Sequence, residues 1–260
     1  MADWDPALYL QFSDDRTRPA VELAAAIPCK APARVLDLGC GPGNSTAVLA
    51  ARFPGAQLLG ADASPAMVAA AQAAYPQYEF AVCDISSQLQ TVGAGWDVVF
   101  SNACLQWVPG HRALLPALYA LLAPGGVLAV QVPLQRAQPV HGLLRELAAA
   151  PRWQKLLQPR PLHLLEPAEY WDLLAGLTPR FRMWQTVYYQ QIESHEALLA
   201  WYRGTGLRPY LAQLPAAQQP AFEADVLAGM RKLYPARPGG AILFPFPRLF
   251  FTAHKPPEQL

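Results

Sequence analysis

The segment Arg34-Val-Leu-Asp-Leu-Gly-Cys-Gly-Pro-Gly43 decides the fold of this chain. It starts as an apolar run that ends in the acid Asp37, and three glycines follow at alternate positions. Glycines in a turn between a strand and a helix let the backbone take positive φ and let a ligand approach closely. Residues 45–53 then carry apolar side chains at helical spacing. The segment therefore predicts a strand, a ligand-binding turn and a helix.

The same alternation continues through the first half of the chain. Helical segments separate further apolar runs, and Ser64-Pro65 opens one of them, with the serine as its cap and the proline at the first helical position. Strands that alternate with helices indicate an α/β fold, a mostly parallel sheet with helices on both faces. The predicted strands after the first are residues 57–62, 78–84, 96–102 and 127–132.

The second half is less regular. Residues 181–191 are aromatic and β-prone, and residues 246–253 predict a last strand. Helical inserts at about 139–177 and 195–240, with the N-terminal segment 1–30, are predicted to form a lid over the ligand-binding edge. No linker or repeat divides the 260 residues, which we expect to form a single domain.

Composition narrows the function classes. Charged residues make up 15% of the chain and the net charge is +1, without the basic stripe that nucleic-acid binding requires. No apolar stretch approaches the length of a membrane span, and no signal peptide is apparent. The four cysteines form no C-x-x-C pair, which argues against a metal site and for a reducing compartment. We expect a cytoplasmic protein with neither nucleic-acid nor membrane partners.

Three predicted strands end in, or just before, an acid: Asp37, Asp62 and Asp84. The carboxyl ends of parallel strands share one edge of the sheet, where ligands of such folds bind. Compared with the dinucleotide fingerprint, the third glycine of the turn comes one residue early and an acid precedes the first. An acid there suits a cationic ligand, such as the amino group of a methionyl moiety, better than a pyrophosphate. Asp62 stands where a carboxylate can accept both ribose hydroxyls.

The glycine turn resembles motif I of class I S-adenosylmethionine-dependent methyltransferases. The chain is also similar, close to end to end, to the trans-aconitate 2-methyltransferase family. The segments that carry this likeness are Asp3-Trp-Asp-Pro-Ala-Leu-Tyr-Leu10, Arg16-Thr-Arg-Pro-Ala-Val-Glu-Leu23, Asp37 to Thr46, Asp62-Ala-Ser-Pro-Ala-Met67, Asn102-Ala-Cys-Leu-Gln-Trp107, Thr205-Gly-Leu-Arg-Pro209 and Phe246-Pro-Arg-Leu-Phe250.

This resemblance implies a Rossmann-like, seven-stranded sheet whose last strand is antiparallel, and S-adenosylmethionine as the cofactor, with S-adenosylhomocysteine as its product. It places the glycines at the methionyl part, Asp62 at the ribose, Asp84 at the adenine edge and Asn102 beside the sulfonium. The full predicted cofactor set is Asp37, Gly39, Gly41, Gly43, Asn44, Asp62, Ala63, Met67, Asp84, Ile85 and Asn102.

The resemblance also implies a small polycarboxylic acid as the acceptor, namely trans-aconitate, which would be converted to its monomethyl ester. A carboxylic acid is ionised at neutral pH and attacks a sulfonium methyl without a general base, so we expect no catalytic base. His111 and His141 are the candidate bases if the acceptor were a hydroxyl. A polyanion needs positive charge in the pocket, and arginine binds carboxylates bidentately. The predicted acceptor-binding residues are Arg18, Arg208 and Arg248, with Tyr9, Gln106 and Trp107 as walls.

Departures from the family pattern keep alternatives open. Leu134 and Gln135 stand where the family often has Asp and Asn, and Tyr210 replaces a Trp. These positions touch the expected acceptor pocket, so another small acid, or a biosynthetic hydroxyl or carbon, remains an alternative acceptor. A nicotinamide-dependent dehydrogenase and a non-catalytic cofactor-binding module are the readings from other functional classes.

Overall fold

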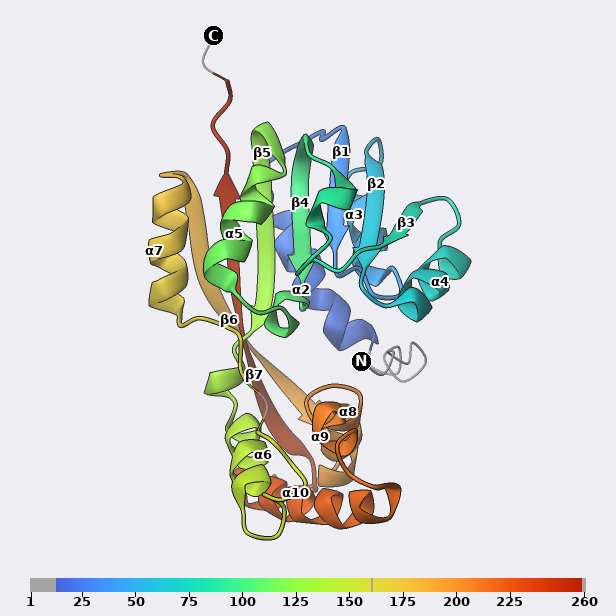
Figure 1. Ribbon diagram of the computed structural model, residues 1–260, viewed down its shortest axis with the longest axis vertical. Coiled ribbons are helices and arrows are strands. Elements are labelled where there is room, and N and C mark those ends of the chain that lie inside the picture. Colours follow the sequence, from blue (N-terminus) through green and yellow to red (C-terminus); the bar gives the residue numbers. More distant parts are fainter. Residues whose placement is uncertain (1–12, 160, 259–260) are drawn as a thin grey trace.

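A computed structural model describes residues 13–159 and 161–258. Its strands are β1 (Arg34–Leu38), β2 (Gln57–Asp62), β3 (Glu79–Val82), β4 (Trp96–Asn102), β5 (Leu122–Pro133), β6 (Phe181–Ile192) and β7 (Ile242–His254). They form one sheet in the order β3-β2-β1-β4-β5-β7-β6 (Figure 1). Neighbours from β3 to β5 are parallel, whereas β7 runs antiparallel to both β5 and β6. The predicted mostly parallel sheet with an antiparallel last strand is confirmed.

Strand β1 lies at the centre of the parallel part of the sheet. Its residues Val35, Leu36 and Leu38 are fully buried, which explains the continuous apolar run in the sequence. Strands β2 and β3 extend the sheet on one side of β1, and β4 and β5 extend it on the other. The strand order therefore reverses between β1 and β4, and a ligand crevice is expected beyond the carboxyl ends of these strands.

Helices cover both faces of the sheet. On one face, α2 (Ser13–Ala25) and α3 (Asn44–Arg52) pack in a core that includes Leu23 and Leu49. On the other, α5 (His111–Ala120) and α7 (Pro167–Leu177) share a core that includes Leu115 and Tyr170. Helix α4 (Pro65–Ala74) packs on β2 and β3, and Ser64 caps it as predicted by accepting a hydrogen bond from the Met67 backbone N–H.

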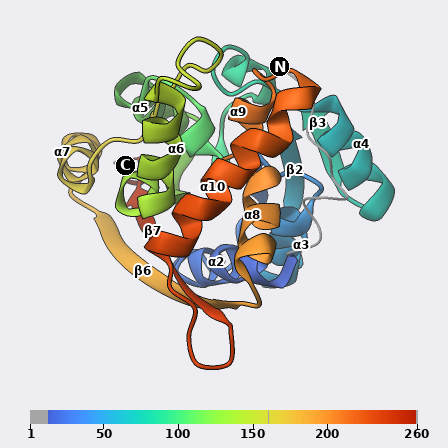
Figure 2. The ribbon, with the colours of Figure 1, turned by 90° about the horizontal axis from the view of Figure 1, so that it is seen from below.

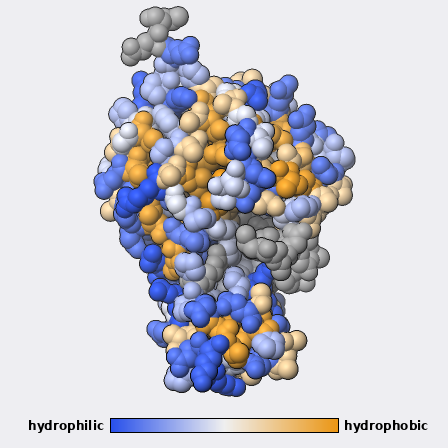
Figure 3. All heavy atoms as spheres, viewed as in Figure 1, coloured by the Kyte–Doolittle hydropathy of each residue, from blue (hydrophilic) through white to orange (hydrophobic). Residues whose placement is uncertain are grey.

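A second group of helices forms what we call the helical lobe, below the sheet in Figure 1. It consists of α6 (Pro139–Ala149), α8 (His195–Arg203), α9 (Arg208–Leu211) and α10 (Gln219–Leu233), with the far ends of β6 and β7. The lobe has a hydrophobic core of its own, which contains Leu144, Trp201, Phe222 and Phe244. Figures 2 and 3 show α10 along its lower side and the smaller lobe projecting from the main body.

The β6–β7 ribbon joins the two parts. Its pairing runs without a break from Phe181–Ala253 to Ile192–Ile242, so β7 begins four residues earlier than the predicted 246–253. Prolines 245 and 247 lie in this strand and lack a backbone N–H. The carbonyl of Pro247 faces the β5 side, where it accepts a hydrogen bond from Leu134 N–H, and β5 itself pairs only as far as Pro133. Both proline nitrogens therefore face the side where no strand needs their missing N–H.

The predicted helical stretch 139–177 is two helices with a long connection. Residues 150–159 and 161–166 contain no α-helix or strand. Prolines at 151, 159 and 161 remove backbone donors there, which explains the interruption. Helix α7 packs beside α5, β6 and β7, whereas α6 packs against α10 in the lobe. Within the described residues, no helix is long and apolar enough to cross a membrane.

Candidate active site

The glycine turn after β1 allows other groups to approach its backbone closely. Gly39 has φ 75°, and a Cβ on it would overlap Sγ and Cβ of Cys104. Gly41 has φ 55°, but a Cβ there would meet no described atom within 4 Å. One glycine therefore serves the packing of the turn, and the other borders open space in which a ligand can lie against the backbone.

Asp37 lies fully buried beneath this turn. Its Oδ2 accepts hydrogen bonds from Ser45 Oγ at 2.6 Å and Thr46 Oγ1 at 2.7 Å, both from the first turn of α3. Its Oδ1 has no hydrogen-bond partner among the described residues. Burial raises the pKa of the Asp37 carboxyl from 3.8 to about 6, against the opposing effect of the two hydroxyl donors. A cation placed near Asp37 would favour its ionised form.

Asp62 ties β2 to the glycine turn. Its Oδ2 accepts a hydrogen bond from Gly41 N–H at 2.9 Å, and its Oδ1 accepts one from Ser64 N–H at 2.9 Å. The two backbone donors fix the carboxylate at the carboxyl end of β2, and its contact with the ribose stays a prediction. The next residue, Ala63, is exposed, and Met67 is buried in the first turn of α4.

The ends of β3 and β4 complete the edge. Asp84 accepts hydrogen bonds from the backbone N–H and the hydroxyl of Ser86, which lower the pKa of its carboxyl, and Ile85 is buried in the core. Asn102 ends β4, and its Oδ1 is buried without a hydrogen-bond partner in the described chain. The structure thus brings the predicted cofactor residues to the carboxyl ends of β1 to β4. Their contacts with the cofactor stay a prediction.

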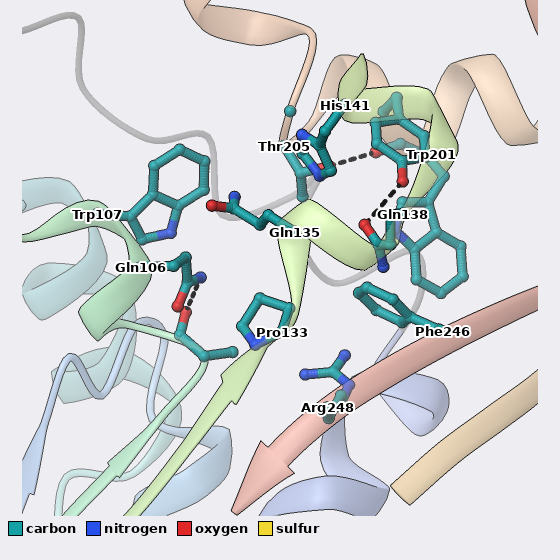
Figure 4. A pocket seen from close by; sticks show the side chains of 13 residues that line it. Gln106, Trp107, Pro133, Gln135, Gln138, His141, Trp201, Thr205, Phe246 and Arg248 are labelled. Atoms are coloured by element: carbon teal, nitrogen blue, oxygen red, sulfur yellow. Dashed lines mark hydrogen bonds between the residues drawn. The ribbon is translucent and has the colours of Figure 1, made fainter. Parts of the chain in front are cut away.

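A cavity lies between this edge and the helical lobe (Figure 4). Its volume is about 80 Å³, room for several non-hydrogen atoms, since one buried water needs roughly 10 to 15 Å³. Among the predicted acceptor-binding residues, Gln106, Trp107 and Arg248 line it. The other described lining residues are Ala103, Pro133, Gln135, Gln138, His141, Trp201, Tyr202, Thr205, Gly206 and Phe246.

Arg248 supplies the positive charge of this cavity. It sits on β7 opposite Pro133 of β5, and its side chain is 3% exposed. Its Nη1 donates to Oε1 of the fully buried Gln131 at 3.0 Å, and its guanidinium lies 4.3 Å from the ring centroid of Phe246. Packing and hydrogen bonding hold the planar group in place, which suits bidentate binding of a carboxylate.

The structure does not place the other three predicted acceptor residues in the cavity lining that it describes. Arg18 is an exposed side chain that pairs with Glu22 at 2.9 Å and lies over the ring of Tyr188. Arg208 begins α9 and is half-buried, and neither arginine is among the described lining residues of the cavity. Tyr9 lies outside the described residues. Acceptor-binding roles for these three residues remain predictions.

The two candidate histidines have different surroundings. Nε2 of His111 lies 3.0 Å from the carbonyl oxygens of both Leu105 and Val108, so it carries the hydrogen and donates. Nδ1 therefore accepts, and the hydroxyl of Tyr170 donates to it at 2.7 Å. Burial lowers the pKa of His111. This buried histidine supports the short turn Leu105–Trp107, whereas His141 lines the cavity beside Tyr202.

Sequence reasoning missed much of the lobe side of the cavity, including Gln138, Trp201, Tyr202 and Phe246. Phe246 begins one of the family-like segments, but no local motif marks Gln138, Trp201 or Tyr202, because they meet only when α6, α8 and the ribbon come together.

The described residues hold no group of three His, Cys, Asp or Glu side chains that could bind a metal ion.

Comparison with known proteins shows that the sequence is similar to those of methyltransferases. A family model described as "Methyltransferase domain" matches residues 35–126. The chain is 45% identical over 260 residues to the trans-aconitate 2-methyltransferase of Methylobacterium radiotolerans, covering 98% of this chain and 99% of that protein. It is 47% identical over 261 residues to the trans-aconitate 2-methyltransferase of Yersinia pseudotuberculosis, with 98% and 99% coverage.

Solved structures agree in fold. The YcgJ protein of Bacillus subtilis superposes with a TM-score of 0.61 at 15% identity, over 93% of this chain and 100% of that one. A Haemonchus contortus phosphoethanolamine N-methyltransferase 2 bound to S-adenosylhomocysteine gives 0.54 at 18% identity, over 92% of this chain and 53% of that one. These likenesses concern the fold alone, whereas identity above 40% along nearly the whole length of curated relatives shows common membership. The chain belongs to the trans-aconitate 2-methyltransferase family, a family of S-adenosylmethionine-dependent methyltransferases.

Proposed function

We propose that this protein transfers the methyl group of S-adenosylmethionine to one carboxylate of trans-aconitate, giving a monomethyl ester and S-adenosylhomocysteine. The observation that carries the proposal is the buried Arg248 in a cavity that also touches Ala103 and Gln106, immediately after the end of β4. An anionic acceptor held there lies next to the edge at which the cofactor is expected. Both curated relatives are named trans-aconitate 2-methyltransferase, and this chain matches 99% of the length of each.

The residues at that edge suit the cofactor. Gly41 leaves room for a ligand against the backbone, and the unpaired oxygens of Asp37 and Asn102 are acceptors for a cationic amino group. Asp62 is fixed to accept ribose hydroxyls. When bound, the cofactor supplies an electrophilic methyl on its sulfonium sulfur. Family membership places the chain with methyltransferases, and not with nicotinamide-dependent dehydrogenases.

The protein residues position the acceptor and exclude water. An ionised carboxylate needs no general base, so alignment of its oxygen with the methyl carbon provides most of the rate increase. Arg248 would withdraw electron density from any carboxylate it grips, so it holds a carboxylate that does not react. Trp107 and Phe246 wall the cavity and keep water from competing for the methyl.

The acceptor is a small molecule, and we propose a cytoplasmic location for the reaction. The four cysteines, at positions 29, 40, 83 and 104, are free thiols, and two of them, Cys40 and Cys83, are buried. Free thiols persist in a reducing compartment.

The test is a kinetic comparison of acceptors with purified protein and S-adenosylmethionine. The panel contains trans-aconitate, cis-aconitate, isocitrate and small monocarboxylic acids. Several acids are compared because Gln135 lines the cavity at a position where the family often has Asn. We expect the highest kcat/KM for trans-aconitate. A higher kcat/KM for another acid would assign that acid as the acceptor, and absence of product with every acid would refute the proposal.

A further inference from the structure

Gln138 has a buried amide that the fold satisfies on one side only. The residue immediately precedes α6, and its side chain is 2% exposed. The hydroxyl of Tyr202 donates to its Oε1 at 3.2 Å (Figure 4). Its Nε2 finds no acceptor within residues 13–159 and 161–258. Tyr202 thus occupies the amide oxygen, and the buried N–H groups of Gln138 are left without an acceptor beside the cavity that this residue lines.

Helix capping does not explain this side chain. Gln138 stands at the N-cap of α6, yet it makes no side-chain hydrogen bond to the first turn. Serine, threonine, aspartate and asparagine are the residues that stabilise this position. A buried donor without an acceptor destabilises a fold, and native proteins rarely retain one without a ligand or water that satisfies it. The amide therefore points to an acceptor atom supplied by a bound molecule.

The electrostatics around Gln138 favour an anion. Helix α6 has 11 residues and no acidic residue in its first turn, so the partial positive charge of its N-terminus is not neutralised by its own side chains. His141 lies one turn along and lines the same cavity. Arg248 lines it from β7, and the described lining residues include no carboxylate.

We propose that Gln138, with the N-terminal turn of α6, holds a second non-reacting carboxylate of the acceptor, while Arg248 holds the first. This inference rests on the proposed function. Tyr202 is a positioning residue, because its hydroxyl fixes which end of the amide faces the cavity. Two separate carboxylate sites make the cavity selective for a tricarboxylate over a dicarboxylate.

The first test replaces the amide by an apolar side chain of similar size. Gln138→Leu should raise KM for trans-aconitate about tenfold to a hundredfold, the effect of losing a hydrogen bond to a charged group. We expect kcat to change less than about threefold and affinity for S-adenosylhomocysteine to stay constant. Gln190→Leu is the matched control, because Gln190 is another buried glutamine with an unpaired oxygen in the described chain and lies outside the cavity lining.

Two more variants separate recognition from structure. Tyr202→Phe keeps the amide but releases its orientation, so KM should rise less than in Gln138→Leu, again with little change in kcat. The double variant Gln138→Leu/Tyr202→Phe removes both polar partners together, which leaves no new unsatisfied group and keeps the protein folded. Its KM should match that of Gln138→Leu.

Three dicarboxylates locate the carboxylate that Gln138 binds. Mesaconate, cis-glutaconate and itaconate each lack a different one of the three carboxylates of trans-aconitate. Their inhibition constants against trans-aconitate are measured with the wild type and with Gln138→Leu. Two of them should bind the variant more weakly, and the third, which lacks the carboxylate held by Gln138, should bind both proteins equally.

The outcomes distinguish this inference from the proposed function. Wild-type protein that makes no ester from trans-aconitate would overturn both. If the wild type is active and the KM of Gln138→Leu is unchanged, only the inference is overturned. A lower KM in Gln138→Leu would also overturn it, because it would mean that the amide oxygen faces the cavity. Equal effects on all three dicarboxylates would also overturn it, because they would indicate a general disturbance of the pocket.

Discussion

Replacing Gly39 with alanine is predicted to lower mainly the stability of the protein, whereas replacing Gly41 is predicted to lower mainly its affinity for the cofactor product. Gly39→Ala places a Cβ into Cys104 and forces a left-handed residue at φ 75°. The backbone costs about 1 to 2 kcal/mol and the overlap about 1 to 3 kcal/mol. The free energy of unfolding should fall by about 2 to 5 kcal/mol, and the melting temperature by about 4 to 20 °C.

Gly41→Ala adds a Cβ where no described atom lies within 4 Å, so only the backbone term applies, about 1 to 2 kcal/mol. The new methyl occupies the space beside the turn, and affinity for S-adenosylhomocysteine should fall by about tenfold or more. The assays are thermal unfolding without ligand and calorimetric titration with S-adenosylhomocysteine. Gly176→Ala is the control, an exposed glycine in α7 without close neighbours, and it should raise stability by up to about 1 kcal/mol.

The reasoning would be refuted if Gly41→Ala bound S-adenosylhomocysteine as tightly as the wild type, because the open space beside Gly41 would then not be the cofactor site. A Gly39→Ala protein as stable as the wild type would contradict the packing role assigned to Gly39.

Three further predictions concern Asp37, Arg248 and His111. Because burial raises the pKa of Asp37 from 3.8 to about 6, the ligand-free fold loses stability as pH rises through this interval. Asp37→Asn should therefore raise stability by up to about 3 kcal/mol at about pH 8, with the gain disappearing towards about pH 4; an equal gain at both pH values in thermal unfolding would contradict this. Arg248→Gln should raise KM for trans-aconitate by about tenfold or more with S-adenosylhomocysteine affinity unchanged. The KM of Arg248→Lys should lie between the values of the wild type and Arg248→Gln. Loss of cofactor affinity in calorimetry would count against the assigned role. His111→Leu leaves two carbonyl oxygens and a tyrosine hydroxyl unpaired, so urea unfolding should show a loss of roughly 2 to 4 kcal/mol, and a loss below about 1 kcal/mol would argue against His111 as the support of its turn.

The cofactor edge could be predicted from sequence because its signals are local. A strand, an acid and glycines with positive φ lie within ten residues, from Arg34 to Gly43, and backbone geometry allows few alternatives to glycine there. Asp62 follows from the same logic at the next strand. Sequence alone also gave the boundaries of β2 and β4 as the structure has them.

The acceptor side was harder to predict because it depends on tertiary contacts. The arginines at 18, 208 and 248 looked equivalent in sequence, yet only Arg248 is among the described residues that line the cavity. Its position follows from the β5–β7 register, which no local pattern encodes. Gln138 gave no signal because a glutamine before a helix usually faces solvent. Here Tyr202, far away in the chain, donates a hydrogen bond to its amide oxygen, and both residues line the cavity.

The central claim is methyl transfer to a carboxylate oxygen of trans-aconitate, and mass spectrometry of the product tests it most directly. Purified protein is incubated with trans-aconitate and S-adenosylmethionine that carries a trideuterated methyl group. We predict a product that is trans-aconitate plus one trideuteromethyl group, and mild base should return it to trans-aconitate, as expected for an ester. No labelled product, or a labelled product that survives mild base, would contradict carboxylate methylation.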